Sequence, residues 1–333
     1  MKKIGDLEGK VFMTSVACMS VWADGLSWAN AHKDKVTLNP EEADNIIVLS
    51  CQVTDLAILN DIRTLERYKE KYPGKKYFTS GCLAHREDVD IPGFIERLDL
   101  PKEDYQPIFD RNLIYYEKPF WVPDFKEQDK ELADGHLLRN MYPLRIGKGC
   151  PNNCTYCTIR KTRGKFEKYE SERLEEEFLM FDDVLLVADN PLIPQIKRWA
   201  AIAEKNNKRF SIRNVEPSTT VQCKDELLSL ADKGLLKVFH SPIQSSSPEV
   251  LRDMGRNVES TFETMRIAEE LKQKGVTIAT NIIIDYKDFK QDFSRVYELY
   301  DYVSWNPLWD GKWDRQKAEK KGLENTLKVG RSH

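Results

Sequence analysis

Three apolar runs in the first 90 residues end directly at a cysteine. The run KVFMTSVAC ends at Cys18, NIIVLSC ends at Cys51 and KKYFTSGC ends at Cys82. Between the second and third runs, apolar side chains recur at helical spacing over residues 55–72, until a Pro-Gly pair interrupts them. A strand, a helix and a strand in this order predict a parallel sheet, whose carboxyl ends share one edge. We therefore expect the three cysteines to converge at that edge.

Packing is the alternative explanation, because a single cysteine at a strand end is often only a small buried residue. Three successive strands with the same ending favour a metal site formed by Cys18, Cys51 and Cys82. The total of seven cysteines is odd, which rules out complete pairing in disulfides and favours metal or redox chemistry. Cys223 stands outside these patterns, and we interpret it as a free thiol without a catalytic role.

A second alternation of strands and helices begins at Tyr142, after a charged, Pro-punctuated segment over residues 91–139 that shows no sustained period. Strands are expected at YPLRIG, DVLLVAD, RFSIRN, LKVFHSPI, VTIATNIII and YVSW, and helices near residues 171–180, 193–205 and 260–274. Repeated β-α units of this length predict a partial or full (β/α) TIM-like barrel, whose reactive face is the carboxyl end of the strands.

The predicted fold class is α/β, with two domains, because 333 residues are long for one hydrophobic core. We expect a parallel-sheet, flavodoxin-like domain over residues 1–130, the barrel domain over residues 131–306 and a short tail over residues 307–333. In the tail region, Trp305, Trp309 and Trp313 recur at four-residue spacing, which favours one face of a packed helix or turn over a base-stacking platform.

Charge gives little support for nonspecific binding to polyanions, since the net charge is −3. One local patch, TIRKTRGKFEK over residues 158–168, holds five basic residues and a single acid. A solvated charged surface is the ordinary explanation of such a run. The alternative is a substrate-binding patch formed by Arg160, Lys161, Arg163 and Lys165.

The sequence has no apolar run of 18 residues or more, and its start lacks the apolar segment of a signal peptide. We therefore expect a cytoplasmic protein without a membrane partner. The five histidines are scattered, and none stands at ligand spacing to a cysteine. No chemistry is assigned to them from the sequence.

A second group of cysteines follows the first strand of the barrel region. Cys150, Cys154 and Cys157 are spaced C-x3-C-x2-C, close enough to wrap one compact metal centre. Thiolate-rich sites favour zinc or an iron-sulfur cluster. A closed zinc site needs four ligands, and no fourth cysteine or histidine lies nearby in the sequence. Three ligands on a cluster of four irons would leave one iron open to a substrate or cofactor.

This spacing on a strand-to-loop junction resembles the signature of the radical S-adenosylmethionine (SAM) superfamily. The resemblance implies a 4Fe-4S cluster on Cys150, Cys154 and Cys157, with its open iron binding the amino and carboxylate groups of SAM. Reduction of the cluster would then generate a 5′-deoxyadenosyl radical that abstracts a hydrogen atom. A flavodoxin or ferredoxin is the implied electron donor, and the protein positions the cofactor against one C–H bond.

Both cysteine groups together resemble the MiaB/RimO-like radical SAM methylthiotransferases. The segments PEEADNIIVLSCQVTD, TSGCLA, GCPNNCTYC with TRG, SPIQSSSPEVLRDMGR and IATNIIIDY are similar to that family. The resemblance implies a second 4Fe-4S cluster on Cys18, Cys51 and Cys82 that carries the sulfur to be inserted. It also implies two roles for SAM, methylation of that sulfur and generation of the radical, so that a C–H bond becomes C–S–CH3.

Four residues are the expected SAM contacts. Tyr156 occupies the place of an aromatic that packs near the adenine in this superfamily, and Asn190, Arg213 and Gln244 follow predicted strands on the reactive face. The alternatives are a loop-packing aromatic for Tyr156 and a turn or cap role for Asn190. The sequence suggests no catalytic residue beyond the cluster ligands.

The chain departs from the family pattern at several places. Residues 285–288 read Asp-Tyr-Lys-Asp where the family usually has Gly-Phe-Pro-Gly, residues 188–190 read Ala-Asp-Asn, and residues 245–247 read Ser-Ser-Ser. Lost glycines change which backbone groups can approach a cofactor. Only a short segment follows the barrel region, so we expect the family's C-terminal TRAM domain to be absent.

The expected substrate is an adenosine next to a tRNA anticodon, because the CTYC and TRG segments resemble the tRNA-modifying branches and basic residues lie beside the reaction loop. The main alternative is a protein side chain, such as an aspartate of a ribosomal protein, which the near-neutral charge favours. A noncatalytic cluster-binding or redox protein is the third hypothesis.

Overall fold

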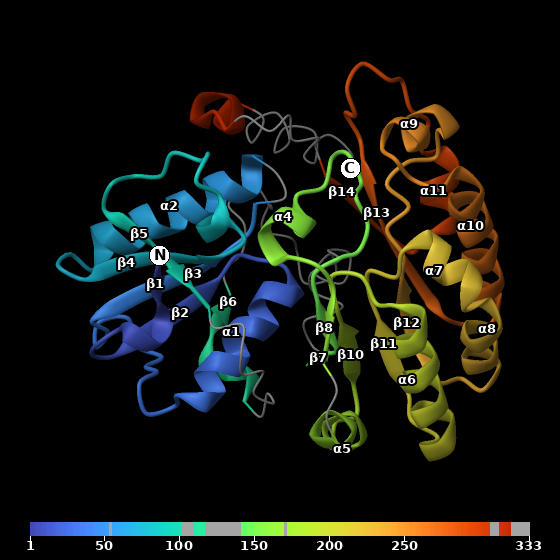
Figure 1. Cartoon of the computed structure of the whole chain (residues 1–333), viewed down its shortest axis with the longest axis horizontal. Coiled ribbons are helices and arrows are strands. Elements are labelled where there is room, and N and C mark those ends of the chain that lie inside the picture. Colours follow the sequence, from blue (N-terminus) through green and yellow to red (C-terminus); the bar gives the residue numbers. More distant parts are fainter. Residues whose placement is uncertain (53–54, 101–109, 117–140, 170–171, 307–312, 321–333) are drawn as a thin grey trace. The chain divides into compact units, whose positions relative to one another are not determined.

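The computed structural model describes residues 1–52, 55–100, 110–116, 141–169, 172–306 and 313–320 (Figure 1). The chain divides into two compact units. Unit 1 comprises Met1–Phe125 together with Trp309–His333, and unit 2 comprises Lys126–Leu308.

Unit 1 contains a parallel sheet with the strand order β1-β5-β4-β3-β2-β6. Its elements, in chain order, are β1 (Lys2–Lys3), the 3-10 helix η1 (Ile4–Asp6), β2 (Val11–Ser15), α1 (Met19–Ala31), β3 (Asn45–Ser50), α2 (Asp55–Lys71), β4 (Lys76–Gly81), η2 (Leu83–His85), β5 (Ile95–Asp99), η3 (Arg111–Leu113) and β6 (Tyr115–Tyr116). The parallel α/β architecture predicted from the sequence is confirmed.

Helices cover both faces of the unit 1 sheet, as the fully buried strand β3 requires. Alternate side chains of a strand point to opposite faces. Ile46 and Val48 pack in one apolar cluster with Leu65 of α2. Leu49 points the other way, where it lies against Gly25 of α1 so closely that an added Cβ would sit 2.3 Å from it.

The order of the unit 1 strands changes direction beside β2. From β2 the chain adds β3, β4 and β5 on one side, and β6 then pairs with β2 on the other side. This order differs from the 2-1-3-4-5 order of flavodoxin itself. In open α/β sheets, ligands bind outside the carboxyl ends of the strands at such a reversal. Cys18 follows β2 at this point in the sheet.

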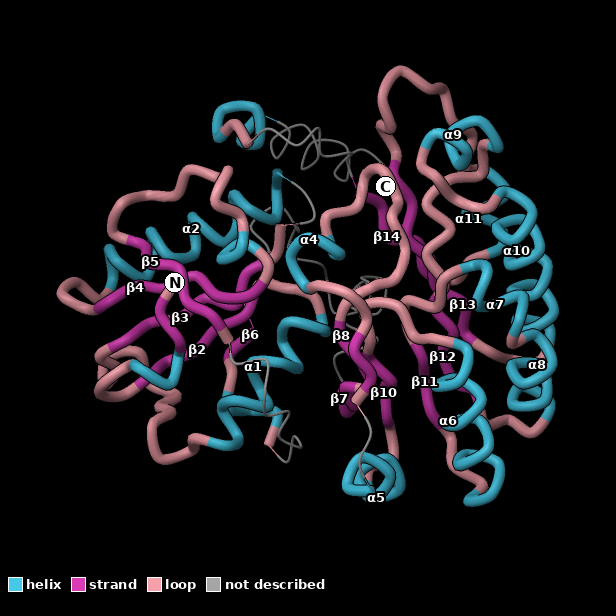
Figure 2. The backbone as a smooth tube through the Cα atoms, in the orientation of Figure 1, coloured by secondary structure: helices cyan, strands magenta, loops and turns pink. Residues whose placement is uncertain are grey.

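Unit 2 contains six parallel strands that neighbour one another in their sequence order, β7-β10-β11-β12-β13-β14 (Figures 1 and 2). They are β7 (Tyr142–Arg145), β10 (Val184–Val187), β11 (Phe210–Ile212), β12 (Leu236–His240), β13 (Thr277–Ile283) and β14 (Tyr302–Asn306). Among the described strands β7 and β14 end the sheet, so the partial barrel is the form observed rather than the full one. Two short strands, β8 (Gly147–Lys148) and β9 (Glu167–Lys168), form a separate antiparallel pair.

Helices line the outer side of the unit 2 sheet (Figure 2). The unit 2 helices are α4 (Ile159–Arg163), α5 (Glu172–Met180), α6 (Ile193–Asn206), α7 (Pro217–Gln222), α8 (Lys224–Asp232), α9 (Pro248–Asp253), α10 (Val258–Gln273) and α11 (Ser294–Leu299). Their starts follow local capping chemistry. Ser247 and Asn257 accept hydrogen bonds from backbone N–H groups in the first turns of α9 and α10. Pro217 and Pro248 occupy first helical positions, where proline is favoured.

Of the three tryptophans predicted to lie on one face of a packed helix or turn, Trp305 lies in a strand instead, whereas Trp313 is packed as expected. Trp305 lies in strand β14 of unit 2. Trp309 lies outside the described residues. Trp313 is partly buried in unit 1, where it packs against an apolar cluster around α2. A four-residue spacing is compatible with a helix, but Trp305 belongs to a strand of unit 2 and Trp313 to unit 1.

Candidate metal centres

The loop that carries Cys150, Cys154 and Cys157 leaves the carboxyl end of β7. The antiparallel pairing of β8 with β9 closes its base. Gly149 has a φ of +80°, and a Cβ there would lie 2.3 Å from the carbonyl oxygen of Lys165. The two arms of the loop therefore approach so closely that only glycine fits at this position. The backbone N–H of Cys150 donates to the carbonyl of Gly164 across this contact at 3.4 Å.

Asp189, just beyond β10, holds the base of this loop. Its Oδ2 accepts hydrogen bonds from the backbone N–H of Gly149 at 2.8 Å and from Nε of Arg163 at 2.7 Å. Nη2 of Arg145 lies 3.4 Å from the same oxygen. Burial alone would raise the pKa of the Asp189 carboxyl, but the two guanidinium groups outweigh it and hold this pKa below its usual range. Asp189 is therefore an anion that joins both arms of the loop to the sheet.

The second half of the loop docks on the end of α9. The N–H of Thr155 donates to the carbonyl of Met254 at 3.1 Å, and its hydroxyl donates to the carbonyl of Asp253 at 3.0 Å. The buried Tyr286, which follows β13, donates its hydroxyl to Oδ2 of Asp253 at 2.6 Å and lies 3.3 Å from the hydroxyl of Thr155. Lys287 also pairs with Asp253. Side chains thus clamp the loop where the family pattern has a glycine-rich turn.

Tyr156, between the second and third cysteines of the loop, packs into the apolar cluster that contains Tyr286 and Met254. Its hydroxyl accepts a hydrogen bond from Nη1 of Arg256 at 3.2 Å. Burial raises the pKa of the Tyr156 hydroxyl well above its ordinary value. Nη2 of Arg256 also donates to the carbonyl of Pro242 at 2.7 Å, so the aromatic ring is fixed against the strand ends.

The cysteine sulfurs of this loop lie in a setting that suits bound iron. Sγ of Cys150 accepts hydrogen bonds from the N–H of Asn152 at 3.4 Å and from Nδ2 of Asn190 at 3.6 Å. Burial raises the pKa of the Cys150 thiol and raises that of Cys157 to about 11. Burial thus favours the protonated thiols, so that a bound cluster would have to displace their protons. N–H donors to sulfur are a recognised feature of iron-sulfur sites, so the residues present fit such a cluster.

A row of hydrogen-bonded polar groups crosses the carboxyl ends of the central strands. The side chain of Asn214, after β11, donates to the carbonyl of Ala188, and its backbone N–H donates to Nδ1 of His240 at 3.0 Å. Because Nδ1 accepts, the proton of the neutral ring is on Nε2, which lies 3.0 Å from Oδ1 of Asn281. His240 is fully buried and links three strands. The sequence offered no signal for it, because its partners are distant along the chain.

The predicted SAM contacts all lie on this face of unit 2. Asn190 is 4% exposed, and its Oδ1 has no hydrogen-bond partner among the described residues. Arg213 and Gln244 are partly buried after β11 and β12. Gln244 has a φ of 68° and bonds through its backbone to Asn281 and Ile283, which fixes the start of its loop. The contacts of these side chains with SAM stay a prediction.

The three cysteines of unit 1 follow adjacent strands. The strands β2, β3 and β4 pair in parallel, with Ser15 opposite Leu49 and Ser50 opposite Gly81. Cys18 is exposed at the N-cap of α1, Cys51 is partly buried and Cys82 is buried. The expected placement of all three cysteines at one edge of the sheet is thus observed.

Buried polar groups fix the segments that hold Cys51 and Cys82. Oδ2 of Asp61, fully buried in α2, accepts the backbone N–H of Cys51 at 2.9 Å. Burial raises the pKa of this carboxyl well above its ordinary value. Gln52 accepts a hydrogen bond from Nη1 of Arg86 at 2.9 Å, which ties the segment after Cys51 to the segment after Cys82.

Gly81 permits a close approach in the same place. Its φ is +92°, and an added Cβ would lie 2.7 Å from Val21 of α1 and 2.8 Å from the carbonyl of Ser50.

Among the described residues, no group of three His, Cys, Asp or Glu side chains is arranged to hold a single metal ion. A 4Fe-4S cluster does not require such an arrangement, because each of its cysteines binds a different iron.

Comparison with known proteins identifies the chemistry of the unit 2 loop. Residues 144–300, which include Cys150, Cys154 and Cys157, match the radical SAM superfamily. A probable threonylcarbamoyladenosine tRNA methylthiotransferase of Pyrococcus horikoshii is 28% identical in an alignment that covers 87% of this chain and 73% of that protein. The ribosomal protein uS12 methylthiotransferase RimO of Clostridium botulinum is 25% identical in an alignment that covers 94% of this chain and 77% of that protein. This chain is similar to the radical SAM methylthiotransferases over most of its length.

Among solved structures, the radical SAM methyltransferase TsrM from Kitasatospora setae aligns with 83% of this methylthiotransferase homologue and 68% of its own chain, with a TM-score of 0.49 and 10% identity. The superfamily match and the relatives confirm the predicted family, the parallel α/β fold and an enzyme of the radical SAM class. Membership of the superfamily implies a 4Fe-4S cluster and SAM.

The basic residues of the cysteine loop divide into two kinds in this methylthiotransferase homologue. Arg160, Lys161 and Lys165 are exposed, as a substrate-binding patch requires. Arg163 is only 6% exposed and its guanidinium binds Asp189, so it holds the loop together instead of facing a substrate. The sequence run alone could not separate it from its neighbours, because its partner lies 26 residues further along the chain.

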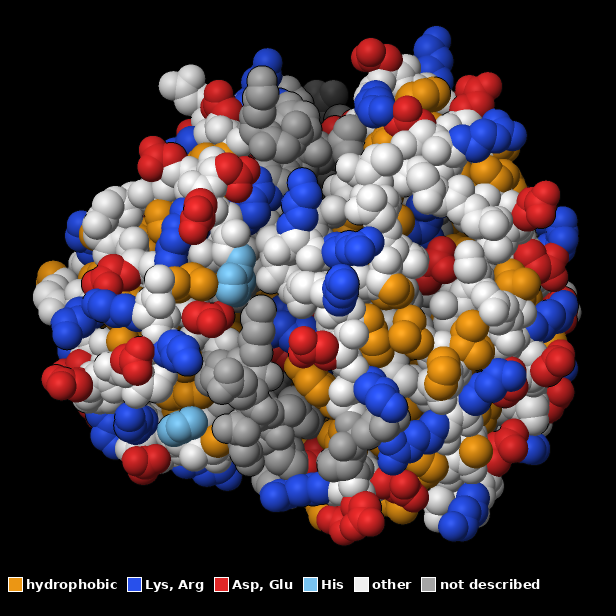
Figure 3. Space-filling model, in the orientation of Figure 1, with side chains coloured by type: hydrophobic (Ala, Val, Ile, Leu, Met, Phe, Trp, Pro, Cys, Tyr) orange, Lys and Arg blue, Asp and Glu red, His pale blue; other side chains and the backbone are white. Residues whose placement is uncertain are grey.

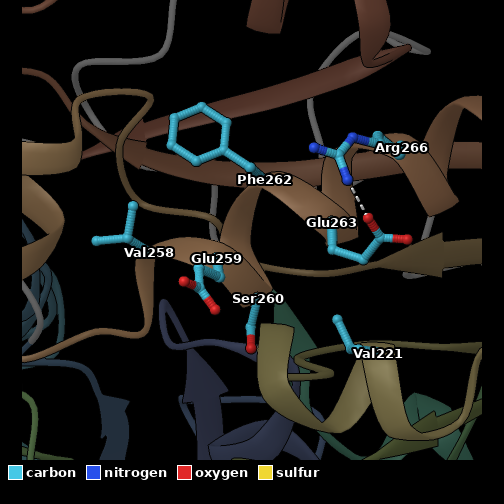
Figure 4. Close-up of a pocket in the computed structure, with 7 residues that line it drawn as sticks. All are labelled: Val221, Val258, Glu259, Ser260, Phe262, Glu263 and Arg266. Atoms are coloured by element: carbon cyan, nitrogen blue, oxygen red, sulfur yellow. Dashed lines mark hydrogen bonds and ion pairs between the residues drawn. The ribbon is translucent and has the colours of Figure 1, made fainter.

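Two further features of the methylthiotransferase homologue lie away from these sites. Cys223 is buried between α7 and α8, where burial raises the pKa of its thiol to about 11, and the structure gives it no part in either cysteine group. A surface cavity of about 510 Å³ lies between α7 and the first turns of α10, and it contains no predicted site residue (Figure 4).

Among the described residues, no helix is long and apolar enough to cross a membrane.

Proposed function

We propose that this chain inserts a methylthio group at a C–H bond of an adenosine next to a tRNA anticodon. The observation that supports this substrate is the position of exposed Arg160, Lys161 and Lys165 on the loop that also carries Cys150, Cys154 and Cys157. Phosphate contacts from such side chains position a nucleic acid, and a base in a single-stranded loop can enter a pocket. The Pyrococcus relative is named for a modified tRNA adenosine.

The proposed reaction uses two 4Fe-4S clusters, one held by each cysteine triad, and two molecules of SAM. When bound, the cluster of unit 2 supplies the electron that cleaves SAM, with a flavodoxin or ferredoxin as the proposed donor. Asp189 fixes the base of its loop, Asn190 donates to the sulfur of Cys150, and Arg256 holds Tyr156 through a hydrogen bond to its hydroxyl.

In unit 1, the proposed sulfur-carrying cluster needs only the ligands Cys18, Cys51 and Cys82, which leaves one of its irons open. Asp61 accepts the backbone N–H of Cys51, and Arg86 ties Gln52 to the segment after Cys82, so both segments are held in place. The placement at the carboxyl edge of the sheet, beside the reversal of strand order, supports this proposal.

Methylthiolation of a protein side chain is the second candidate. Several relatives are named as methylthiotransferases of ribosomal protein uS12. Lys and Arg side chains are interspersed with Asp and Glu on the face drawn in Figure 3, and the net charge is −3. A mixed surface of this kind favours a protein substrate more than a nucleic acid.

Salt dependence of binding separates the two candidates. We expect Lys161→Ala with Lys165→Ala to weaken tRNA binding about tenfold at low salt and to reduce the salt slope by about 2, since each lost phosphate contact removes roughly one unit. Lys205→Ala, an exposed lysine of α6, is the matched control and should change neither value. Fluorescence anisotropy with unmodified tRNA over a range of salt concentrations measures both.

A salt slope near zero for the wild-type protein with tRNA would contradict the tRNA proposal. Specific binding of ribosomal protein uS12 under the same conditions would instead support the second candidate. Equal effects of the loop variant and the Lys205→Ala control would show that the loop patch is not the contact surface.

A further inference from the structure

Residues 313–320, which follow the barrel in the sequence, pack on unit 1. Trp313 lies against an apolar cluster of Ile58, Ile62, Leu83 and Val89. The first two belong to α2, and Leu83 directly follows Cys82 at the start of η2. A tryptophan in this place connects the main helix of unit 1 to the segment that carries a cysteine ligand.

Charged side chains set the register of this contact. Residues 315–320 are helical, and Arg315 makes two hydrogen bonds to the carboxylate of Glu66 on α2, at 2.7 and 2.9 Å. Glu319, one turn further, accepts a hydrogen bond from Arg63 of α2 at 3.2 Å and another from Arg315 at 3.1 Å. The network joins two positions on each helix.

The ion pairs and the packing of Trp313 contribute differently to the stability of this contact. Arg315 and Glu66 are 43% and 34% exposed, and ion pairs with this exposure contribute little stability. Their paired geometry instead selects one alignment of the two helices. The packing of Trp313 is the main attractive contribution, because aromatic side chains bury a large apolar area.

We propose that residues 313–320 are a positioning element for the cysteine edge of unit 1. The same helix α2 that receives Trp313 also presents Asp61 to the backbone N–H of Cys51. Leu83 in the receiving cluster adjoins Cys82. The segment therefore braces the positions of two of the three cysteines from the opposite end of the chain. Its relevance to a sulfur-carrying cluster rests on the proposed function, whereas its effect on Cys82 does not.

Thiol labelling of metal-free protein tests the positioning directly. Cys82 is 3% exposed, so its alkylation reports local opening. We expect Trp313→Ala to speed the alkylation of Cys82 about tenfold, because the receiving cluster loses its cover. Trp313→Phe, which keeps an aromatic ring, should restore most of the protection. The buried Cys223 of unit 2 is the internal control and should react at its wild-type rate.

A charge exchange tests the register. Arg315→Glu and Glu66→Arg should each speed alkylation of Cys82, and the two together should return it toward the wild-type rate. An unchanged rate at Cys82 in Trp313→Ala overturns the proposal. A rise at Cys82 and Cys223 together also overturns it, since general unfolding would then be the cause.

Iron content connects this element to the proposed function. In a background in which Cys150, Cys154 and Cys157 are alanine, Trp313→Ala should reduce the iron that unit 1 retains in the presence of a chelator. In the reverse background, without Cys18, Cys51 and Cys82, it should not change retention. If the first background binds no iron even with Trp313 present, the proposal of a sulfur-carrying cluster is wrong. The labelling result still decides whether residues 313–320 position Cys82.

Discussion

Asp189 lies where the two arms of the unit 2 cysteine loop meet. Its side chain is 5% exposed and contacts Arg163 and Arg145 as well as the N–H of Gly149. Removing one partner of a buried ion pair lowers the free energy of unfolding far more than removing one partner of an exposed pair, because the remaining charges stay desolvated. The loop geometry therefore depends on the charge of this carboxylate as well as on its shape.

We expect Asp189→Asn to destabilise unit 2 by about 3 kcal/mol, because two guanidinium groups lose their anion while the shape of the side chain is kept. Asp183→Asn is the matched control. Asp183 pairs with Lys237 at 2.6 Å, but it is 55% exposed, and the loss of such a pair changes stability by about 1 kcal/mol or less. Denaturant unfolding of both metal-free variants gives the comparison. Equal effects would show that Asp189 does not organise the loop.

At the level of residues, the sequence predicted the position of side chains that follow a local pattern. The cysteines follow strand ends, and that position is visible in the sequence. The roles of Asp189 and His240 in connecting several elements were not predicted, and Arg163 was assigned to substrate binding. Each of these depends on partners that only the folded sheet brings together, such as the bond of His240 to Asn281.

At the scale of elements, the loop after β13 replaces glycines by a side-chain clamp. Tyr286 holds Asp253 and Thr155 through its hydroxyl, while its ring packs with Val250, Met254 and Ile283. The clamp joins α9, β13 and the cysteine loop. Residues 285–288, which lack the glycines of the family pattern, therefore supply side-chain contacts in their place.

We expect Tyr286→Phe to keep the apolar packing and to lose about 1 kcal/mol of unit 2 stability, since only the hydroxyl bonds are removed. The same change should speed the loss of iron from the unit 2 cluster to a chelator, because Thr155 lies between two of its ligands. Tyr297→Phe, at a residue that is 54% exposed, is the control and should alter neither property. Unchanged iron loss in Tyr286→Phe would mean that the clamp does not position the loop.

Elements were predictable from the sequence where apolar periodicity continued to a clear stop. The strands β3 and β4 end at Ser50 and Gly81, directly before the cysteines that marked them. The helix expected over residues 55–72 corresponds to α2, Asp55–Lys71. The docking of Trp313 was not predictable, because the side chains that receive it, such as Ile58, are more than 200 residues away in the sequence.

At the scale of the whole molecule, the chain builds two parallel sheets and places one cysteine triad beyond the carboxyl ends of each. Parallel strands bring their carboxyl ends to one edge, so the same physical rule creates both sites. The two triads are nevertheless held differently. The unit 2 triad shares a single loop, whereas the unit 1 triad is collected from three strand ends. If each triad holds its own cluster, the protein contains two independent clusters, and an analysis of its metal content can test this.

Iron and acid-labile sulfide in anaerobically reconstituted protein provide that test. We expect about eight irons per chain in the wild type and about four when Cys18, Cys51 and Cys82 are all alanine, because each 4Fe-4S cluster carries four. The complementary variant, in which Cys150, Cys154 and Cys157 are alanine, should also hold about four and should lose reductive cleavage of SAM. About four irons in both the wild type and the unit 1 variant would contradict a second cluster. The chain would then have the radical chemistry of unit 2 without a sulfur to transfer, and methylthiotransfer would no longer account for the three cysteines of unit 1.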